Sequence, residues 1–199
     1  MSFALLYKTG GIERRQIRLR VTRVRGKPSV STVRRCRDAE ITTILAIVNA
    51  AADAYRGVIP PDQWHEPYMP LSALRREVEA GVEFWGLEDD GELVGVMGIQ
   101  PVRDVDLIRH AYVRPDRQRR GAGAALIEHL RRQSTRRMLV GTWAAASWAI
   151  DFYRRHGFEL VPSGRAAALL RSYWSIPERQ IETSVVLANP PLPENEECS

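Results

Sequence analysis

The residues best suited to chemistry lie in one short segment that runs from Gln118 to Ala124. A strand-like sequence precedes this segment and a helix-like sequence follows it. Glycine at such a turn lets the backbone approach a ligand closely, and the unpaired N–H groups of a helix start favour a phosphate or pyrophosphate. Arg117, Arg119 and Arg120 add positive charge. The segment therefore predicts a pyrophosphate cradle, with a flexible, solvated basic turn as the plain alternative.

The spacing around Gly121 and Gly123 differs from that of other nucleotide-binding loops. No Gly-Lys-Ser/Thr follows, as a P-loop would require, and the third glycine of a dinucleotide-binding turn is missing.

The elements that would position this segment follow from hydrophobic periodicity and turn residues. Asp38 is placed to cap a helix that Gly57 ends, and Asp89-Asp90-Gly91 and Arg103-Asp104 predict two hairpins. Strands are predicted over 30–35, 82–87, 92–99, 105–113, 138–143, 158–161 and 181–188, and further helices over 72–80, 121–133, 146–156 and 164–174. This order predicts an α/β (α+β) fold with a mixed sheet of about six to seven strands and helices on both faces.

Charge divides the chain into unequal parts. The chain carries +5, and residues 1–29 carry +7, so the remainder carries −2. We therefore predict a basic extension (1–29), one domain (30–188) and a loose tail (189–199). The extension could be an arm for nucleic acid or a membrane surface, an element that packs on the domain, or the product of a start site placed too far upstream.

The composition excludes some classes of protein. No apolar stretch reaches eighteen residues, so we expect no membrane partner. Cys36 and Cys198 lie far apart and form neither a disulfide framework nor a metal spacing, which favours the cytoplasm and no metal.

Four stretches together resemble the GNAT N-acetyltransferases. Gln118-Arg119-Arg120-Gly121-Ala122-Gly123 matches the family's Gln/Arg-x-x-Gly-x-Gly/Ala signature, and the stretches 33–40, 90–95 and 149–158 are similar to its opening strand and helix, its central hairpin and its last helix. The resemblance covers roughly residues 30–188 and implies the GNAT fold, with acetyl-CoA as co-substrate.

The resemblance also implies roles for individual residues. Backbone groups of the strand segment Ala111, Tyr112 and Val113 would hold the pantetheine arm and the thioester carbonyl. The segment Gln118, Arg119, Arg120, Gly121, Ala122, Gly123 and Ala124 would hold the pyrophosphate. Tyr153 matches a tyrosine that protonates the departing CoA thiolate in many relatives, a role that a positioned hydroxyl can fill. A core aromatic beside Phe152 and Phe158 is the alternative reading of Tyr153.

Two positions depart from the family pattern. Ala146 stands where an asparagine often contacts the cofactor, and Gly141 stands where some relatives carry a glutamate base. His110 is a substitute candidate for the base. Strict strand alternation places its side chain on the face of the sheet opposite to that of Arg109, although a bulge would reverse this. The alternatives are that His110 has a structural role, and that a water chain removes the proton of the amine.

We predict that the irregular loop 60–70 borders the binding site of the acceptor amine. Loops of this kind often border sites, and aromatic residues gather in and around it: Trp64, His65, Tyr68, Trp85, Trp143 and Trp174. Core packing is the alternative for each of them. Asp53 and Glu66 are candidates to bind a cationic amine, with solvated surface carboxylates as the alternative.

The sequence thus predicts an enzyme that moves an acetyl group from acetyl-CoA to an unidentified primary amine by direct attack in a ternary complex. The alternative is a non-catalytic GNAT-like module that binds an acyl-CoA or another protein. We do not expect a nucleic-acid partner, and a homodimer is left open.

Overall fold

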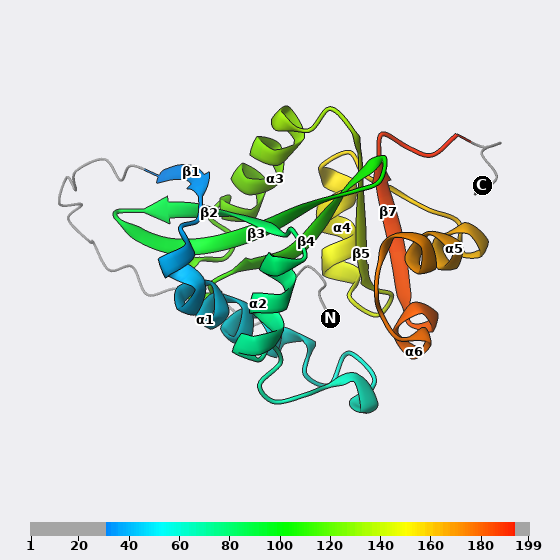
Figure 1. Ribbon diagram of the computed structural model, residues 1–199, viewed down its shortest axis with the longest axis horizontal. Helices are drawn as coiled ribbons and strands as arrows, with labels where there is room; N and C mark the ends of the chain where they lie inside the picture. The colour runs from blue at the N-terminus through cyan, green and yellow to red at the C-terminus, as the bar shows by residue number, and fades with distance from the viewer. Residues whose placement is uncertain (1–30, 194–199) are drawn as a thin grey trace, which may run out of the picture.

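The central element of the structure is a seven-stranded sheet with the order β1-β2-β3-β4-β5-β7-β6 (Figure 1). The structure is a computed structural model that describes residues 31–193. Neighbouring strands are antiparallel except β4 and β5, which are parallel. A parallel pair needs a crossover connection, and here helix α3 supplies it.

The strands are β1 (Ser31–Arg35), β2 (Glu83–Asp89), β3 (Glu92–Val102), β4 (Val105–Val113), β5 (Arg137–Trp143), β6 (Glu159–Leu160) and β7 (Ser184–Asn189). The α-helices are α1 (Ile41–Ala52), α2 (Leu71–Glu79), α3 (Ala122–Gln133), α4 (Ser147–Arg155), α5 (Ser163–Tyr173) and α6 (Glu178–Glu182). Short 3-10 turns cover Asp38–Glu40, Asp53–Tyr55, Pro61–Gln63 and Pro115–Arg117. The sheet and its flanking helices confirm the predicted fold class.

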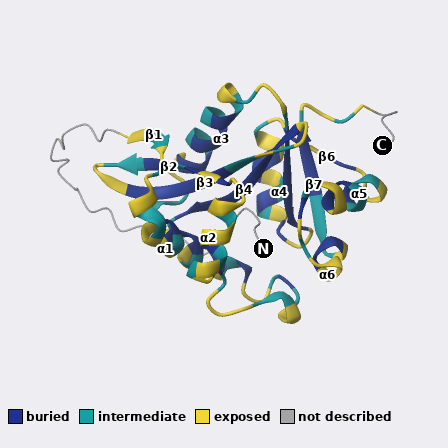
Figure 2. Cartoon of the chain, in the orientation of Figure 1, coloured by how far each residue is buried: buried dark blue, intermediate teal, exposed yellow. Residues whose placement is uncertain are grey.

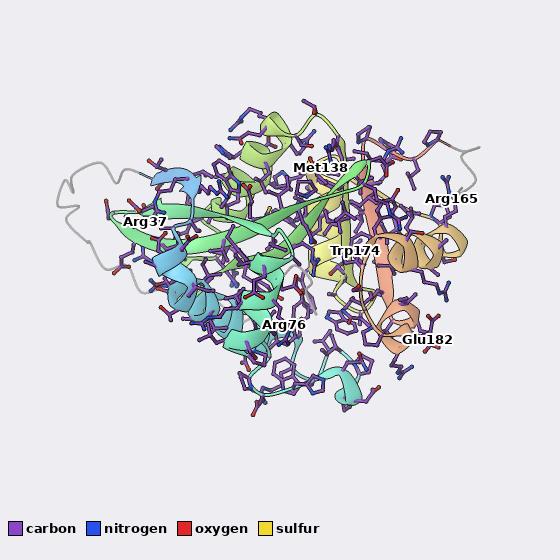
Figure 3. The ribbon with its side chains drawn as sticks, in the orientation of Figure 1. Arg37, Arg76, Met138, Arg165, Trp174 and Glu182 are labelled. Atoms are coloured by element: carbon purple, nitrogen blue, oxygen red, sulfur yellow. The ribbon has the colours of Figure 1, made fainter. Side chains whose placement is uncertain are left out.

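Three buried clusters hold the layers together. Figure 2 shows that the buried residues lie mainly on the strands and on parts of the helices. One joins α1 and α2 to β2, β3 and β4, and includes Val48 and Leu74. A second lies beneath α3 and α4 and includes Leu126 and Phe152. The third joins α5 and α6 to β5 and β7. There Trp174 is buried against the sheet, while Glu182 lies at the exposed outer edge (Figure 3).

The β2–β3 hairpin forms because its turn residues accept a left-handed backbone. Asp90 has φ 50° and Gly91 has φ 83°, which suits the turn that most readily joins twisted antiparallel strands. The predicted hairpin at Asp89-Asp90-Gly91 is thereby confirmed, as is the one at Arg103-Asp104, where Val102 pairs with Val105.

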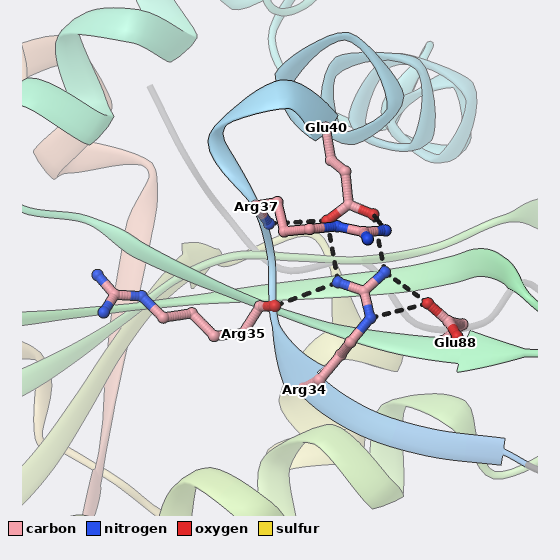
Figure 4. Close-up of polar contacts among 5 residues, drawn as sticks. All are labelled: Arg34, Arg35, Arg37, Glu40 and Glu88. Carbon is pink, nitrogen blue, oxygen red and sulfur yellow. Dashed lines mark hydrogen bonds and ion pairs between the residues drawn. The ribbon is translucent and has the colours of Figure 1, made fainter.

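A charged network fastens β1 to the start of the first helical segment (Figure 4). Arg34 donates to both carboxylate oxygens of Glu40, at 2.9 and 2.7 Å, and its Nε donates to Glu88 of β2 at 2.8 Å. The backbone N–H of Arg37 donates to Glu40 at 2.7 Å. Because each carboxylate receives several charge-assisted bonds, the network satisfies its partly buried charges.

Some predicted boundaries were wrong. Asp38 does not cap the helix: it lies in a 3-10 turn that Arg37 precedes as N-cap, and α1 ends at Ala52, before Gly57. Ile181 lies in α6, which the sequence did not predict, because this polar five-residue helix after Pro177 is too short to show a periodicity. The last strand therefore begins at Ser184.

Candidate functional site

The parallel strands β4 and β5 separate near the middle of the sheet. Their pairing runs from Val105 with Arg137 to Ile108 with Val140. Beyond this point β4 continues to Val113 and β5 to Trp143. Main-chain groups of the second half of β4, on the side toward β5, are therefore free of β5 and can pair with an extended ligand. Ala111, Tyr112 and Val113 lie in this half.

The turn that precedes α3 contains the residues of the predicted cradle. Gly121 has φ 86°, Arg119 has φ 60°, and a Cβ added at Gly121 would meet no other atom within 4 Å. Ala122 and Gly123 begin the twelve-residue helix, with Ala124 in its first turn. Open space beside a left-handed glycine at a helix start fits a pyrophosphate. The side chain of Gln118 instead donates to the Val113 carbonyl at 3.1 Å, joining the turn to the end of β4.

The three arginines of this turn are not equivalent. Arg117 lies 3.3 Å from Asp89 and 3.6 Å from Glu92, so its charge is engaged by the β2–β3 hairpin. Arg119 and Arg120 are exposed beside Gly121. The positive charge available to a ligand at the turn therefore comes from these two, rather than from all three as predicted.

A β-bulge places Arg109 and His110 on the same face of β4. Val96 pairs with Tyr112 and Gly98 with Arg109, so β4 holds one extra residue, and His110 has φ 49°. Both side chains reach Glu77 of α2, whose Oε2 lies 2.5 Å from the Arg109 guanidinium and 3.3 Å from Nε2 of His110. Strict alternation was therefore wrong here, and the bulge is the reason.

Glu77 and His110 are strongly perturbed by this arrangement. Burial raises the pKa of Glu77, but the hydrogen bond to His110 and the charge of Arg109 outweigh burial and lower it overall. Burial lowers the pKa of the fully enclosed His110 well below its usual range, and Glu77 opposes this only in part. His110 is therefore a neutral ring and a weak base near pH 7.

Tyr153 of α4 is fully buried, and its ring packs against Phe152 and Phe158 at centroid distances of 5.1 and 5.5 Å. Its hydroxyl has no hydrogen-bond partner among residues 31–193. Burial raises the pKa of this phenol, so the proton stays on the oxygen across the ordinary pH range. The ring has the packing expected of a core aromatic, whereas the unpartnered hydroxyl is what an acid awaiting a substrate requires.

Further phenol groups adjoin Tyr153. The buried hydroxyls of Tyr68 and Tyr112 interact with each other, and the hydroxyl of Tyr68 also interacts with the indole of Trp143. Burial raises the pKa of Tyr112, and charges on Tyr68, Tyr55 and Tyr153 would raise it further. The four tyrosines therefore form one buried polar group beside the separated half of β4, which we call the tyrosine cluster.

The predicted aromatic residues do not all meet. Trp64 and Tyr68 pack together at 5.6 Å, and Tyr68 stacks on Tyr55 at 6.1 Å. Trp85 instead packs on His129 of α3, Trp174 is buried under α5, and His65 is exposed.

The acidic candidates for the amine are also engaged elsewhere. Arg56 bonds Asp53 at 2.9 Å and also contacts Glu66. Both carboxylates are well exposed and share this cation, so they belong to a surface ion pair rather than to the tyrosine cluster.

Sequence reasoning missed Glu77 and the side chains of Tyr68 and Tyr112 as polar parts of the site. In the sequence, Glu77 is an ordinary polar residue of an amphipathic helix. Tyr112 was predicted to act only through its backbone groups. The available signal was the pair Arg109 and His110 in a strand of mostly apolar residues, because two buried basic groups require a carboxylate partner.

The separated strands, the left-handed glycine turn and the crossover helix are the features that the resemblance to the GNAT acetyltransferases predicts. An acetyltransferase (GNAT) domain description matches residues 80–160. The peptidyl-lysine N-acetyltransferase YiaC of Escherichia coli (strain K12) is 27% identical over 129 residues, which cover 65% of this chain and 84% of that protein.

Solved structures share the fold. The PaiA N-acetyltransferase of Thermoplasma acidophilum, in complex with coenzyme A, has a TM-score of 0.58 at 13% identity and covers 80% of this chain and 98% of its own. An acetyltransferase of Streptococcus agalactiae has a TM-score of 0.60 at 13% identity over 79% and 96% of the two chains. These likenesses show that the chain has the fold of the GNAT acetyltransferases, and that its segment 80–160 is similar to their domain.

Two further findings concern residues 31–193. They contain no helix that is both long and apolar enough to cross a bilayer. They also contain no group of three His, Cys, Asp or Glu side chains placed to share a metal ion. The cytoplasmic location, the domain boundaries and the homodimer stay predictions.

Proposed function

We propose that this protein is an N-acetyltransferase that transfers the acetyl group of acetyl-CoA to a primary amine by direct attack in a ternary complex. The observation that carries the proposal is the separation of β4 from β5 beside the left-handed turn at Gly121. An extended pantetheine arm fits along a strand edge, and a pyrophosphate fits at a helix start. The two features lie at the two ends of one route along β4.

Main-chain groups would make most of the contacts with acetyl-CoA. Ala111, Tyr112 and Val113 would pair with the pantetheine amides, and the N–H groups from Arg119 to Ala124 would hold the pyrophosphate. Gln118 would act through its bond to the Val113 carbonyl, which fixes the turn relative to the strand. Arg119 and Arg120 would add charge from the exposed side.

In the reaction, the amine nitrogen attacks the thioester carbon, and a backbone N–H of β4 stabilises the oxyanion that forms. The C–S bond then breaks. Tyr153 donates its hydroxyl proton to the departing thiolate sulfur, and the proton lost by the amine passes to water and restores the phenol. The raised pKa of Tyr153 keeps its proton available until the thiolate develops.

His110 remains the candidate base named by the sequence, but its surroundings favour a different role. Its Nε2 faces Glu77, its ring packs on Phe84 at 5.5 Å, and burial lowers its pKa. We therefore propose His110 as a positioning residue that holds the β4 bulge, with a water chain removing the amine proton.

Release of CoA over a panel of primary amines tests the proposal, with mass spectrometry to detect each acetylated product. We expect stoichiometric CoA and N-acetyl product with at least one amine. If acetyl-CoA binds but no amine yields product, the non-catalytic acyl-CoA-binding alternative is correct instead.

A further inference from the structure

The backbone of His110 is strained. His110 has φ 49°, in the left-handed region, where the Cβ of a residue other than glycine comes too close to the following carbonyl oxygen. Three other described residues that are not glycine have a positive φ, and all three lie in turns: Asp90, Arg103 and Arg119. His110 instead lies within β4. A residue keeps such a conformation only where its surroundings hold it, and such residues gather at functional sites.

The side chain of Glu77 holds His110 from the helix α2. Its Oε2 lies 3.3 Å from Nε2 of His110, and the fully buried imidazole packs on the ring of Phe84 at a centroid distance of 5.5 Å. A neutral imidazole with its proton on Nε2 can donate to this carboxylate oxygen. The left-handed backbone that carries the ring therefore cannot relax without losing these contacts.

Further hydrogen bonds hold Glu77 in place. The same carboxylate oxygen accepts from Arg109 at 2.5 Å. Arg109 also donates to Gln100 of β3 at 2.6 Å, and Gln100 donates to the carbonyl of Ala80 at 2.8 Å. Ala80 directly follows α2, so these bonds lead from α2 through β4 and β3 back to the end of α2. We call Glu77, Gln100, Arg109 and His110 the α2–β4 clamp.

The bulge that the clamp holds changes the direction of the main chain where β4 leaves β5. Met97 of β3 faces two residues of β4, His110 and Ala111, because Val96 pairs with Tyr112 and Gly98 with Arg109. Both of the facing residues lie beyond the last position of β4 that pairs with β5. A bulge turns its strand locally and leaves the extra residue outside the ladder. It therefore sets the direction of main-chain groups at the position proposed for the thioester carbonyl.

We propose that Glu77 is a positioning residue for acetyl transfer. Its carboxylate holds the ring of His110, and through that ring it keeps the β4 bulge in the left-handed conformation that aims main-chain N–H groups of β4 at the thioester oxygen. This inference rests on the function proposed above and adds to it a residue of α2 that acts through His110.

The two contacts of Glu77 have separable effects. The contact with Arg109 compensates a buried guanidinium, and a buried charge without its partner lowers stability. The contact with His110 maintains the bulge, so its loss lowers the turnover of protein that is still folded. A displacement of about 1 Å between reacting groups can cost on the order of 100-fold in rate.

Glycine and alanine at position 110 test whether the strained backbone matters. Both remove the imidazole, but glycine accepts the left-handed region without strain and alanine does not. With an amine that the panel above shows to be acetylated, we expect kcat of His110→Gly to exceed that of His110→Ala by roughly 5- to 30-fold. Arg103→Gly and Arg103→Ala are the matched control pair, because Arg103 has φ 51° in the turn at the other end of β4, and their kcat values should be equal. Equal kcat values for the two His110 variants, or a lower value for the glycine variant, overturn the inference.

Glu77→Gln tests the carboxylate. We expect kcat to fall roughly 10- to 100-fold while Kd for acetyl-CoA and KM for the amine stay within about threefold, which is the pattern of lost alignment in the transition state. In a His110→Gly background the same change should lower kcat by less than about twofold, because glycine needs no such hold. Asp106→Asn is the matched control, since Asp106 is a buried carboxylate of β4 that accepts from Ser134 at 2.6 Å, and it should lower stability without changing kcat. An equal fall of kcat in both backgrounds overturns the inference.

Denaturant titration gives a second test that needs no acceptor. Glu77→Gln and His110→Gly, alone and combined, form a double-mutant cycle in which the effect on Arg109 cancels. We expect the two changes to be coupled by at least about fivefold in the unfolding equilibrium constant, and additive effects overturn the inference. Absence of product from a broad amine panel, together with a coupled cycle, instead overturns the proposed acetyl transfer and shows that the clamp serves the fold alone.

Discussion

Two clusters of polar side chains in this protein differ in whether they have hydrogen-bond partners within the protein. Arg34, Glu40 and Glu88 satisfy one another through several charge-assisted bonds at the edge of the sheet. In the tyrosine cluster, Tyr153 buries its hydroxyl without a hydrogen-bond partner among residues 31–193. The first network stabilises the fold, because the charge-assisted hydrogen bonds that form on folding replace the hydrogen bonds to water that these side chains lose.

The tyrosine cluster contributes little of this kind, since an unpartnered buried hydroxyl costs stability. Such a cost is typical of binding sites, which keep polar groups ready for a ligand at the expense of the unliganded protein. The contrast predicts that changes in the charged network alter stability and not turnover, and that changes in the tyrosine cluster do the reverse.

Tyr153→Phe should give the largest effect. We expect kcat to fall roughly 10²- to 10⁴-fold, the usual contribution of a positioned acid, while calorimetry shows unchanged acetyl-CoA affinity. Thermal stability should stay the same or rise, because the variant removes an unpartnered hydroxyl and keeps the ring. Unchanged turnover would assign Tyr153 to packing alone and would show that the tyrosine cluster does not serve catalysis.

Gly121→Glu should give the next largest effect, a roughly 100-fold loss of acetyl-CoA affinity, because a carboxylate at the helix start repels the pyrophosphate. Isothermal calorimetry measures this loss. Gly121→Ala and Gly57→Ala are matched controls: both glycines have positive φ and open space at Cβ, so each alanine should cost about 1–2 kcal/mol of stability. Binding that survives Gly121→Glu would place the cradle elsewhere.

Arg34→Met should lower the free energy of unfolding by about 1–3 kcal/mol, because it leaves the carboxylates of Glu40 and Glu88 without their main partner. Denaturant titration measures the change, and kcat should remain at the wild-type value. Arg35→Met is the control on the same strand, because the exposed Arg35 side chain pairs with the exposed Glu83 at 3.3 Å. A loss of turnover in Arg34→Met at temperatures where the variant is folded would contradict the prediction that the charged network affects stability alone.

Acid should weaken the charged network over a defined range of pH. Hydrogen bonds from Arg34 and then from Arg37 lower the pKa of Glu40 below its ordinary value of about 4.3. The stabilisation is therefore complete above about pH 5 and is lost as the pH falls toward the lower pKa of the folded state. We expect denaturation curves of Glu40→Gln to depend less steeply on pH in this range than those of the wild type or of the exposed control Glu159→Gln.

Deletion of residues 1–29 should have the smallest effect. The cut falls before β1 begins at Ser31, so we expect turnover to stay within about twofold of the full chain. Steady-state kinetics on both chains measure this, and loss of folding after the deletion would show that the extension belongs to the domain.

The sequence predicted the sheet and five of its six α-helices because their apolar residues repeat at the spacing of strands and helices. It predicted the turn at Gly121 for the same local reason. It did not settle the side on which His110 lies, because the bulge depends on pairing between β3 and β4. The gathering of Tyr68, Tyr112 and Tyr153 also depends on contacts far apart in the chain, which no local pattern reveals.

The parallel pairing of β4 and β5 also has a consequence for the order of folding. Strands β1 to β4 and the group β5, β7 and β6 each form an antiparallel set, and these two sets meet only where β4 pairs with β5. The β2–β3–β4 hairpins close over short loops, whereas the β4–β5 pair must close across the whole of α3, which is slower. We therefore expect the two sets to join late in folding. A ligand that contacts both β4 and the start of α3 would then bind only after this joining and slow the separation of the two sets, so acetyl-CoA should protect this boundary most strongly against hydrogen exchange.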